Sequence, residues 1–418
     1  MTHEEEYKPK FMEWGIISKE NFTSSKYVPI KRWDPLSTVI IRGEESGQQG
    51  SGQHRYYGHY SYLSPIRAQR PMGYDSLSKK QINFHKCTNE DLYKIKDVFM
   101  ADIEGKAIYN DEGKLMGDGY TIIIAEDEKK RDSPFYDKPH RIAKISESCK
   151  AVTLINRYPA MARVIDPDIY KNVQKELPPN AKIAFGINIL TVSRKFYPAL
   201  SFNLIPIDVL TGIFHSMKSA LLYSIEEAIE RDYYDITVSP FFNIGSQVGG
   251  SQPRIHSQIY IDLNGDGHGS RLESFLKAFK EMGSDCHLCT TSHGKGARII
   301  LETEYWKFYA TGSPSRNFHL RFYPNEHIRR FDQLKPNQFQ DLAKSLKIIF
   351  KALDDLKVDE NRNILFNCCP YGYDADFHMF GDIIPHEIIG GAEMADDMRV
   401  ARKLPEETAE EIRKVIPK

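Results

Sequence analysis

The sequence predicts an α+β fold built from two related halves. Two segments, 209–231 and 336–356, carry apolar residues at steps of three and four, which is the period of an amphipathic helix. Short apolar and β-branched runs bounded by turn residues flank both helices and are typical of strands. The order strand, long helix, strand, irregular turn, histidine-bearing strand occurs twice, over 151–263 and 298–385. This weak internal repeat predicts two halves, each an antiparallel sheet packed with helices.

The predicted elements follow in chain order. The polar run 43–62 has no helical or strand period, which indicates a loop or an insertion. Around the helix 209–231, strands are predicted at 121–127, 151–164 (leading into a proline turn), 181–190, 199–208 and 235–244. The second half is predicted to contain a helix at 270–285 that stops at a glycine, strands at 297–310, 318–324, 364–372 and 377–385, a helix at 336–356 that starts at a proline, and a final helix at 407–416.

Composition narrows the classes of function. The 418 residues suffice for two or three domain-sized units or one large duplicated domain, and the formal net charge of −1 argues against a general nucleic-acid binder. No apolar run reaches membrane length, and the acidic start MTHEEEYK does not resemble a signal peptide. Six scattered cysteines do not indicate a disulfide framework. These features predict a cytoplasmic chain without a membrane or nucleic-acid partner.

A candidate catalytic strand follows a glycine-rich turn. In GGSQPRIHSQIYIDL (249–263) side chains alternate between two faces, so His256 and Gln258 share one face and the isoleucines share the other. Upstream glycines let the backbone approach a phosphate, and Asn243 and Ser251 can add side-chain donors. The polar face of this strand is therefore a candidate phosphate-handling site.

His256 has the chemistry of a nucleophile at neutral pH, because neutral imidazole is well populated there. A carbonyl near the turn Pro253–Arg254 can accept a hydrogen bond from one ring nitrogen and leave the other to attack phosphorus. Gln258 can donate to a phosphoryl oxygen. The alternative interpretation is a buried histidine, satisfied by its surroundings, beside a loop turn.

Five motifs carry a resemblance to a known family. The pattern N-x-G-x-x-x-G-x-S-x-P-x-x-H-x-Q resembles the active-site signature of galactose-1-phosphate uridylyltransferases, the transferase branch of the histidine-triad superfamily, which normally reads S-x-P-H-P-H-x-Q. Other pieces resemble family motifs in the same order: WDPLST (33–38), SPIRAQRP (64–71), NRYPA (156–160), and GGAEMADD (390–397) followed by RKLPEETAEEIRK. Together the matches span residues 33 to about 415.

The resemblance implies two histidine-triad-like halves, 1–265 and 266–418, with the nucleophile in the first. His256 would attack the α-phosphorus of a nucleoside diphosphate sugar, and the nucleotide would then pass to a second phosphate. The implied roles, residue by residue, are phosphoryl-oxygen contacts for Asn243, Ser251 and Gln258, phosphate charge neutralisation for Arg67 and Arg70, a nucleoside pocket for Asn156 and Tyr158, and sugar hydroxyl contacts for Glu393. Surface exposure for the arginines, core packing for Tyr158 and a helix-cap role for Glu393 are the alternatives.

The sequence departs from the family pattern at two places. Arg254 replaces the first histidine of the signature, which in the family often ligates a metal, and only His85 and Cys87 lie near the expected upstream ligands. A first-half zinc site is therefore not expected, and Arg254 is expected to bind an anionic group beside His256 or to form a structural ion pair. Ala392 replaces the family's tyrosine before Glu393, so the resemblance does not determine which sugar is bound.

The second half contains a candidate metal site. Cys286 and Cys289 form a C-x-x-C pair, a spacing that suits chelation of one ion through two thiolates. His327 and His378 lie where ADP-glucose phosphorylase-like members of the family place further ligands, so the resemblance implies a structural Cys2His2 zinc site. The alternative is a pair of reduced buried thiols, and His287 is an alternative ligand.

Three functions remain open. The leading one is nucleotidyl transfer, as in hexose-1-phosphate uridylyltransferases, with a nucleotide sugar and a sugar 1-phosphate as substrates. The second is an ADP-glucose or dinucleoside polyphosphate phosphorylase, in which inorganic phosphate receives the nucleotide. The third is a non-catalytic nucleotide-binding module, because Arg254 replaces a family histidine. By analogy a homodimer is expected.

Overall fold

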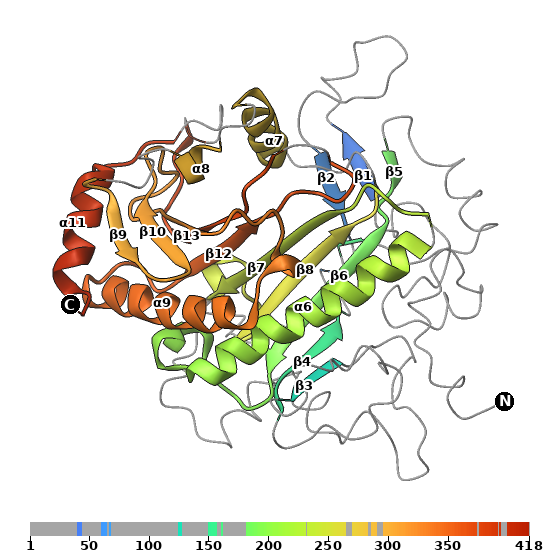
Figure 1. Ribbon diagram of the computed structural model, residues 1–418, viewed down its shortest axis with the longest axis horizontal. Coiled ribbons are helices and arrows are strands. Elements are labelled where there is room, and N and C mark those ends of the chain that lie inside the picture. The colour runs from blue at the N-terminus through green and yellow to red at the C-terminus, as the bar shows by residue number, and fades with distance from the viewer. Residues whose placement is uncertain are drawn as a thin grey trace.

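The computed structural model describes residues 40–43, 60–64, 67, 124–127, 149–156, 160–161, 181–230, 232–264, 270–282, 286–290, 296–373, 376–391, 393 and 399–417. Within this part of the chain the fold is α+β, as the sequence predicts. A ten-stranded antiparallel sheet forms the centre of the molecule, and long helices pack against it (Figure 1).

The order of strands in the sheet shows the internal repeat directly. The order is β3-β4-β6-β8-β7-β12-β13-β11-β10-β9, so five strands of each half are arranged in mirrored order about the β7–β12 pair. The strands of the first half are β3 (Ile124–Asp127), β4 (Cys149–Ile155), β6 (Gly186–Ser193), β7 (Thr237–Ile244) and β8 (His256–Asp262). Those of the second half are β9 (Ile299–Glu302), β10 (Trp306–Ala310), β11 (Leu320–Pro324), β12 (Arg362–Asn367) and β13 (Phe380–Pro385).

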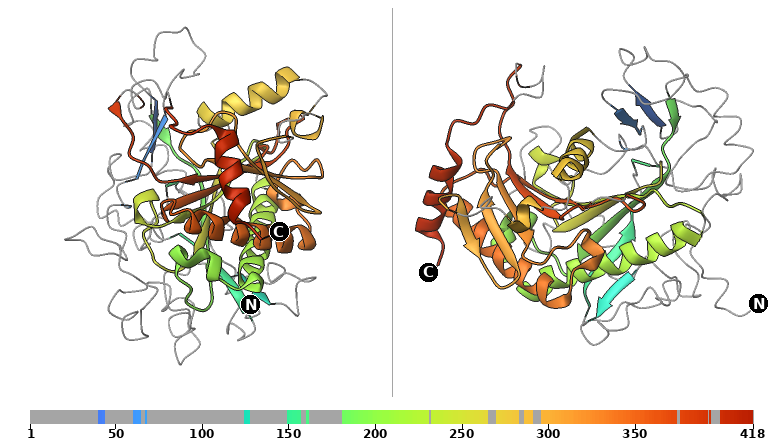
Figure 2. Two further views of the ribbon diagram at one scale, coloured as in Figure 1. Left: turned by 90° about the vertical axis from the view of Figure 1, so that its left-hand side faces the viewer. Right: turned by 45° about the horizontal axis from the view of Figure 1, so that its top comes forward.

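One face of the sheet is covered by the two long helices. Helix α6 (Ile207–Glu230) connects β6 to β7, and α9 (Pro336–Asp355), with a proline at its start, connects β11 to β12. Both lie on the same side of the sheet (Figure 2) and bury a single core of aliphatic and aromatic side chains, including Phe214, Phe242 and Phe339. Helix α11 (Pro405–Val415) packs against α9 and the β9–β10 edge.

The face of the sheet opposite the two long helices carries His256. On its second-half side, Tyr309 and Tyr323 alternate with Phe308 and Phe322 of the main core. These tyrosines belong to a separate cluster with helix α7 (Ser270–Met282), which ends within the range predicted from the sequence. A one-turn helix, α8 (His287–Thr290), follows. Among the described helices, none combines the length and apolarity needed to cross a bilayer.

A second, three-stranded sheet corrects the prediction for the polar run 43–62. Strands β1 (Ile40–Gly43) and β2 (Tyr60–Leu63) pair with each other, and β1 also pairs with β5 (Ala181–Ile183). The two ends of the run are therefore strands, although they lack an apolar alternation of their own. Residues 44–59 between them lie outside the described part. The Tyr62 hydroxyl donates to Asp262, which attaches this sheet to the end of β8.

The predicted strand 199–208 is wrong. Residues Ala199–Leu204 form a 3₁₀ helix, η9, between Pro198 and Ile205, and α6 begins at Ile207. Burial here does not alternate, because Ser201 and Phe202 are both buried. Phe202 packs on Phe242 of the sheet and on Phe350 of α9, so tertiary packing selects the tighter turn over an extended conformation.

Candidate active site and candidate metal centre

His256 is the first residue of β8 and lies inside the molecule. Strand β8 is flanked by β6 and β7, with Val192 opposite His256 and with Phe241 opposite Gln258. The His256 side chain is 3% exposed and Gln258 is 6% exposed. Because both lie on the same face of the strand, they form a buried polar row on the sheet.

The His256 ring is held by a backbone carbonyl. Its Nδ1 lies 2.8 Å from the carbonyl oxygen of Arg254, the turn position that the sequence suggested for such an acceptor. A carbonyl oxygen only accepts, so Nδ1 carries the proton and the neutral ring has its lone pair on Nε2. The geometry thus selects the tautomer in which Nε2 is the nucleophilic nitrogen.

The glycine loop, residues 245–250, lies between β7 and the histidine strand. Gly245 has a φ of +97°, and a Cβ there would lie 2.1 Å from Oδ1 of Asn361. Asn361 Oδ1 also accepts a hydrogen bond from the Gln247 backbone N–H at 3.3 Å. Close packing against Asn361 and a left-handed backbone therefore both require glycine at this position.

Asn243, at the end of β7, is held by the second half of the chain. Nδ2 of Asn363 on β12 donates to Asn243 Oδ1 at 2.8 Å and to the Val248 carbonyl at 3.3 Å. The Asn243 Nδ2 atom lies under the loop, 3.2 Å from the place of a Cβ at Gly249. Ser251 follows the glycine loop and is half-buried. Strand alternation places Asn243 on the same face of the sheet as His256 and Gln258, and Ser251 lies between the two strands in the chain.

Arg254 is buried, with 1% of its side chain exposed. Its Nη1 donates to the carbonyls of Ser193, at 3.1 Å, and Arg194, at 2.7 Å, and its guanidinium carbon lies 5.6 Å from the centre of the Phe196 ring. These partners are backbone and aromatic groups just after β6. The guanidinium is thereby anchored to a neighbouring segment of the fold.

Arg67 and Asn156 lie further along the same sheet. Arg67 Nη1 donates to the Tyr260 hydroxyl at 3.1 Å. The backbone N–H of Asn156 donates to the carbonyl of Asn188, which lies opposite Tyr260 in the β6–β8 ladder. Tyr260 lies four positions after His256 on the strand, at a distance of about 13 Å. The predicted site residues Arg70 and Tyr158 lie outside the described residues.

Glu393 contacts its own segment near the C-terminus. Its carboxylate accepts hydrogen bonds from the backbone N–H of Gly390, at 2.8 Å, and of Val400, at 3.3 Å. These bonds lower the pKa of Glu393 and keep it ionised near neutral pH. None of these contacts involves β8 or the glycine loop.

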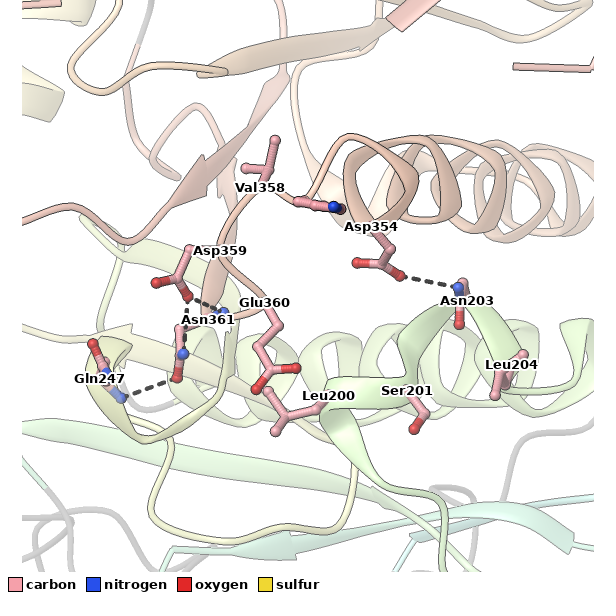
Figure 3. A pocket seen from close by; sticks show the side chains of 11 residues that line it. Leu200, Ser201, Asn203, Leu204, Gln247, Asp354, Val358, Asp359, Glu360 and Asn361 are labelled. Atoms are coloured by element: carbon pink, nitrogen blue, oxygen red, sulfur yellow. Dashed lines mark hydrogen bonds between the residues drawn. The ribbon is translucent and has the colours of Figure 1, made fainter. Parts of the chain in front are cut away.

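A cavity of about 680 Å³ adjoins the back of the glycine loop (Figure 3). Gln247 and Asn361 lie at one end of it, and Asp354, which accepts from Asn203 Nδ2 at 3.0 Å, lies at the other. The described lining does not include His256 or Gln258. The cavity therefore borders Gln247 and Asn361 at the glycine loop, and its described lining does not contain the residues predicted to act on phosphorus.

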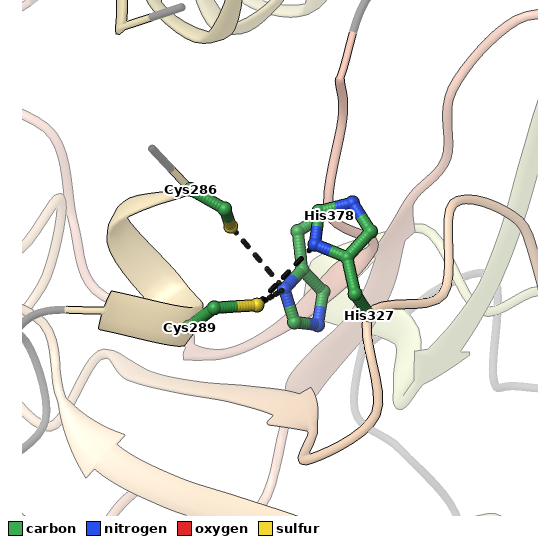
Figure 4. A group of neighbouring side chains, drawn as sticks. All are labelled: Cys286, Cys289, His327 and His378. Carbon is green, nitrogen blue, oxygen red and sulfur yellow. Dashed lines mark hydrogen bonds between the residues drawn. The ribbon is translucent and has the colours of Figure 1, made fainter. Parts of the chain in front are cut away.

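The four predicted metal ligands converge in the second half (Figure 4). The ligand atoms of Cys286, Cys289, His327 and His378 all lie within 4.8 Å of one another. His378 Nδ1 lies 3.4 Å from each sulfur, and His327 Nδ1 lies 3.3 Å from the sulfur of Cys289. Tetrahedral zinc bonds imply ligand separations of about 3.3 to 3.8 Å, so these side chains can hold such an ion. The side chain of His287 lies outside the described part.

An oxygen atom lies beside Nε2 of each imidazole ring. His378 Nε2 lies 3.0 Å from the Pro324 carbonyl, and His327 Nε2 lies 2.9 Å from a carboxylate oxygen of Asp376. The His378 ring can therefore present the lone pair of Nδ1 to a metal, an arrangement common around metal-binding histidines. The contact between His327 and Asp376 has an ion-pair distance but not the geometry of a hydrogen bond.

Ionisation at this cluster matches a metal-binding role. Burial and the neighbouring His327 lower the pKa of His378 to about 4, so the ring is neutral at neutral pH. Burial and the neighbouring Cys286 raise the pKa of the Cys289 thiol to about 11. A bound cation would favour the thiolate, so metal binding here is expected to release protons.

The structure also shows a buried polar group that the sequence reading missed. Asp382, on β13, is fully buried and accepts hydrogen bonds from Arg271, Arg321 and Asn367 at 2.6 to 3.0 Å. His319 Nε2 lies 3.1 Å from its Oδ1. The signal available in the sequence was RNILFN (362–367), in which Asn363 and Asn367 alternate with the apolar Ile364 and Phe366.

Comparison with solved structures identifies the same architecture elsewhere. A uridylyltransferase matches with a TM-score of 0.53 and 20% identity, covering 65% of this chain and 87% of that chain. An ADP-glucose phosphorylase from Arabidopsis thaliana was solved with bound ADP-glucose. It matches with a TM-score of 0.54 and 19% identity, covering 66% of this chain and 84% of that chain. A GalT-like protein from the same plant matches with a TM-score of 0.51 and 20% identity, covering 64% of this chain and 85% of that chain.

No sequence model of a known protein family matches the chain. At identities of 19 to 20% the structural likeness concerns the fold, and it covers most of each of the three proteins. The chain therefore has the fold shared by a uridylyltransferase, a GalT-like protein and an ADP-glucose phosphorylase.

Proposed function

We propose that this protein is a nucleotidyltransferase that acts on a nucleoside diphosphate sugar through a nucleotidyl-histidine intermediate. The observation that carries the proposal is the arrangement at the start of β8. There His256 Nδ1 is held by the Arg254 carbonyl, Gln258 shares its face, and the glycine loop precedes it. Hexose-1-phosphate uridylyl transfer is the preferred reaction, supported by the sequence motifs and by the fold.

The reaction proceeds in two displacements. Nε2 of His256 attacks the α-phosphorus, a P–N bond forms, and the P–O bond to the sugar 1-phosphate breaks. A phosphate oxygen of the acceptor then attacks the same phosphorus, and the P–N bond breaks to regenerate the neutral ring. Asn243, Ser251 and Gln258 hold the phosphoryl oxygens, where donors stabilise the charge of the transition state.

The remaining site residues take roles at the edges of this centre. Arg67 and Arg70 neutralise phosphate charge, Asn156 and Tyr158 line the nucleoside pocket, and Glu393 binds sugar hydroxyls. The cluster Cys286, Cys289, His327 and His378 holds a structural zinc ion, which supplies stability and takes no part in the displacement steps.

A phosphorylase is the second candidate. In this reaction inorganic phosphate, in place of a sugar 1-phosphate, removes the nucleotide from His256. The Cys2His2 grouping in the second half favours it, because the resemblance associates that ligand set with ADP-glucose phosphorylase-like proteins.

The first test is adduct formation on a panel of nucleotide sugars that includes UDP-glucose and ADP-glucose. We expect the mass of the protein to increase by one nucleoside monophosphate, located on a peptide that contains His256. The His256→Ala variant should form no adduct, because it lacks the attacking nitrogen. Mass spectrometry of the intact protein and of its peptides gives the measurement.

A matched control separates the possible outcomes. The His386→Ala variant removes a half-exposed histidine that follows β13 and whose ring faces Asp359, and it should label like wild type because its backbone bond to Asn361 is kept. Normal turnover by His256→Ala would refute the assigned nucleophile, and binding of a nucleotide sugar without any adduct would favour a non-catalytic module. Treating the labelled protein with phosphate or with galactose 1-phosphate then distinguishes phosphorylase from transferase.

A further inference from the structure

Arg254 connects His256 to a different strand through two parts of one residue. Its carbonyl oxygen lies 2.8 Å from Nδ1 of the histidine ring. Its guanidinium donates to the carbonyls of Ser193 and Arg194, at the end of β6. Arg254 thus links the orientation of the His256 ring, through its carbonyl, to the position of its own guanidinium at the end of β6.

The backbone around Arg254 is attached to the same segment. Ile255 N–H donates to the Tyr197 carbonyl at 2.8 Å, and Ala199 N–H donates to the Pro253 carbonyl at 2.8 Å. Arg254 itself forms an isolated antiparallel bridge with Pro198. Proline has no N–H to donate to the bridge, so side-chain hydrogen bonds become more important at this position.

The burial of Arg254 indicates a function that justifies its cost. Arg254 is 1% exposed, so its guanidinium loses most of its hydration, and the contacts that replace this water include two backbone carbonyls and one aromatic face. Both hydrogen bonds leave from the same nitrogen, Nη1. The planar guanidinium also lies over the Phe196 ring, a contact that the ammonium group of lysine does not reproduce. Tethering a strand alone would need no buried charge, whereas fixing a reacting ring within a narrow angle benefits from a charged group held by two hydrogen bonds and an aromatic face.

We propose that Arg254 is a positioning residue for the nucleophile, and that it acts through its own carbonyl without touching the substrate. The guanidinium fixes the Arg254 peptide against the end of β6, and that peptide fixes His256 as the Nδ1–H tautomer. This role deepens the proposed function and rests on it for its catalytic consequence. The tautomer claim itself holds whether or not His256 becomes nucleotidylated.

The test uses full-length protein labelled with ¹⁵N-histidine. Long-range ¹H–¹⁵N correlation spectra at neutral pH report which ring nitrogen carries the proton, and His256→Ala identifies the His256 signals by their absence. We expect Nδ1–H in wild type and a mixture of tautomers in Arg254→Met. The rate of adduct formation in Arg254→Met should fall about tenfold to hundredfold, with the half-saturating nucleotide-sugar concentration unchanged.

Two further variants keep the result interpretable. Arg254→Lys preserves the charge and a single donor nitrogen but lacks the planar group over Phe196, so we expect an intermediate tautomer shift. This variant carries the test where Arg254→Met does not fold. Arg413→Met removes another arginine that donates to two carbonyls, those of Ala297 and Ile299, but from α11. It should leave the His256 signals and the labelling rate unchanged.

Several outcomes would overturn the positioning role. An unchanged His256 tautomer in Arg254→Met, or in Arg254→Lys where that variant carries the test, would show that the guanidinium does not orient the ring. A rise in the half-saturating concentration at an unchanged rate would assign Arg254 to anion binding instead. Absence of any adduct in wild type would refute the proposed function while leaving the tautomer result to decide the role of Arg254.

Discussion

At the scale of single residues, the pKa of the buried Asp382 carboxylate is strongly perturbed. Burial raises its pKa, but Arg321, His319 and Arg271 outweigh burial and hold the pKa well below its ordinary value. The folded state therefore binds the proton less readily than the unfolded state. The stability that this group contributes is present above the unfolded pKa and is lost as the pH falls below about 5.

The first residue-scale prediction concerns Asp382→Asn. Removing the charge leaves two arginines without their shared buried partner, so at pH 7 the free energy of unfolding should fall by about 3 to 5 kcal/mol. The difference in the free energy of unfolding between wild type and this variant should narrow below about pH 5, by at most about 1.4 kcal/mol per pH unit. Urea unfolding at pH 7 and pH 4 measures both values.

Asp354→Asn provides the matched control. Asp354 pairs with Arg362 at 2.8 Å, but burial raises its pKa despite that arginine. A raised carboxyl pKa means that the folded state gains stability relative to the variant as the pH falls. The two variants should therefore show opposite pH trends, and parallel trends would contradict the account of Asp382.

At the scale of secondary-structure elements, strand β12 of the second half and the residue before it support the glycine loop of the first half. Asn361 packs against Gly245, and Asn363 binds both Asn243 and the Val248 carbonyl. The β7–β12 pair is also the junction between the two halves in the sheet. The loop predicted to hold phosphate thus depends on side chains that lie more than 100 residues further along the chain.

The element-scale prediction is that Asn363→Ala weakens the glycine loop. Loss of its two hydrogen bonds should lower the free energy of unfolding by about 1 to 2 kcal/mol and slow adduct formation about tenfold. Asn325→Ala is the control, since Asn325 also donates through Nδ2 to two backbone carbonyls but lies beyond β11. Equal labelling rates in the two variants would show that β12 does not position the loop.

At the scale of the whole molecule, one continuous sheet unites the two halves, and the Cys/His cluster ties three segments of the second. It connects α8, the turn after β11 that carries His327, and the segment before β13 that carries His378. The boundary at residues 265 and 266 stays a prediction. Because the ligands converge only in the folded chain, metal affinity should add to folding stability.

The whole-molecule prediction concerns metal removal. Purified protein should contain one zinc per chain, and chelation should lower the thermal midpoint by about 5 °C or more. Cys286→Ser should lose the metal and become insensitive to chelator. Cys369→Ser, which changes a buried cysteine outside the cluster, should keep the metal. Full zinc occupancy in Cys286→Ser would refute the assigned ligand set.

The sequence by itself determined the α+β class, the two long helices, the histidine strand and its two faces, and the four residues of the Cys/His cluster. These features follow from local periodicity and from short motifs, which act over a few residues. The cluster required two distant histidines as well, and the resemblance to known motifs indicated them. The strands at the ends of 43–62 and the 3₁₀ turn at Ala199–Leu204 were missed, because pairing and aromatic packing from distant segments decide them.

Only the tertiary structure decided what surrounds these residues. The tautomer of His256, the anchoring of Arg254 on β6, the support of the glycine loop by Asn361 and Asn363, and the environment of Asp382 all depend on contacts between segments far apart in the chain. A sequence pattern records which groups are available for chemistry. Their protonation and orientation are set by burial and by hydrogen-bond partners, and these exist only after the sheet has assembled.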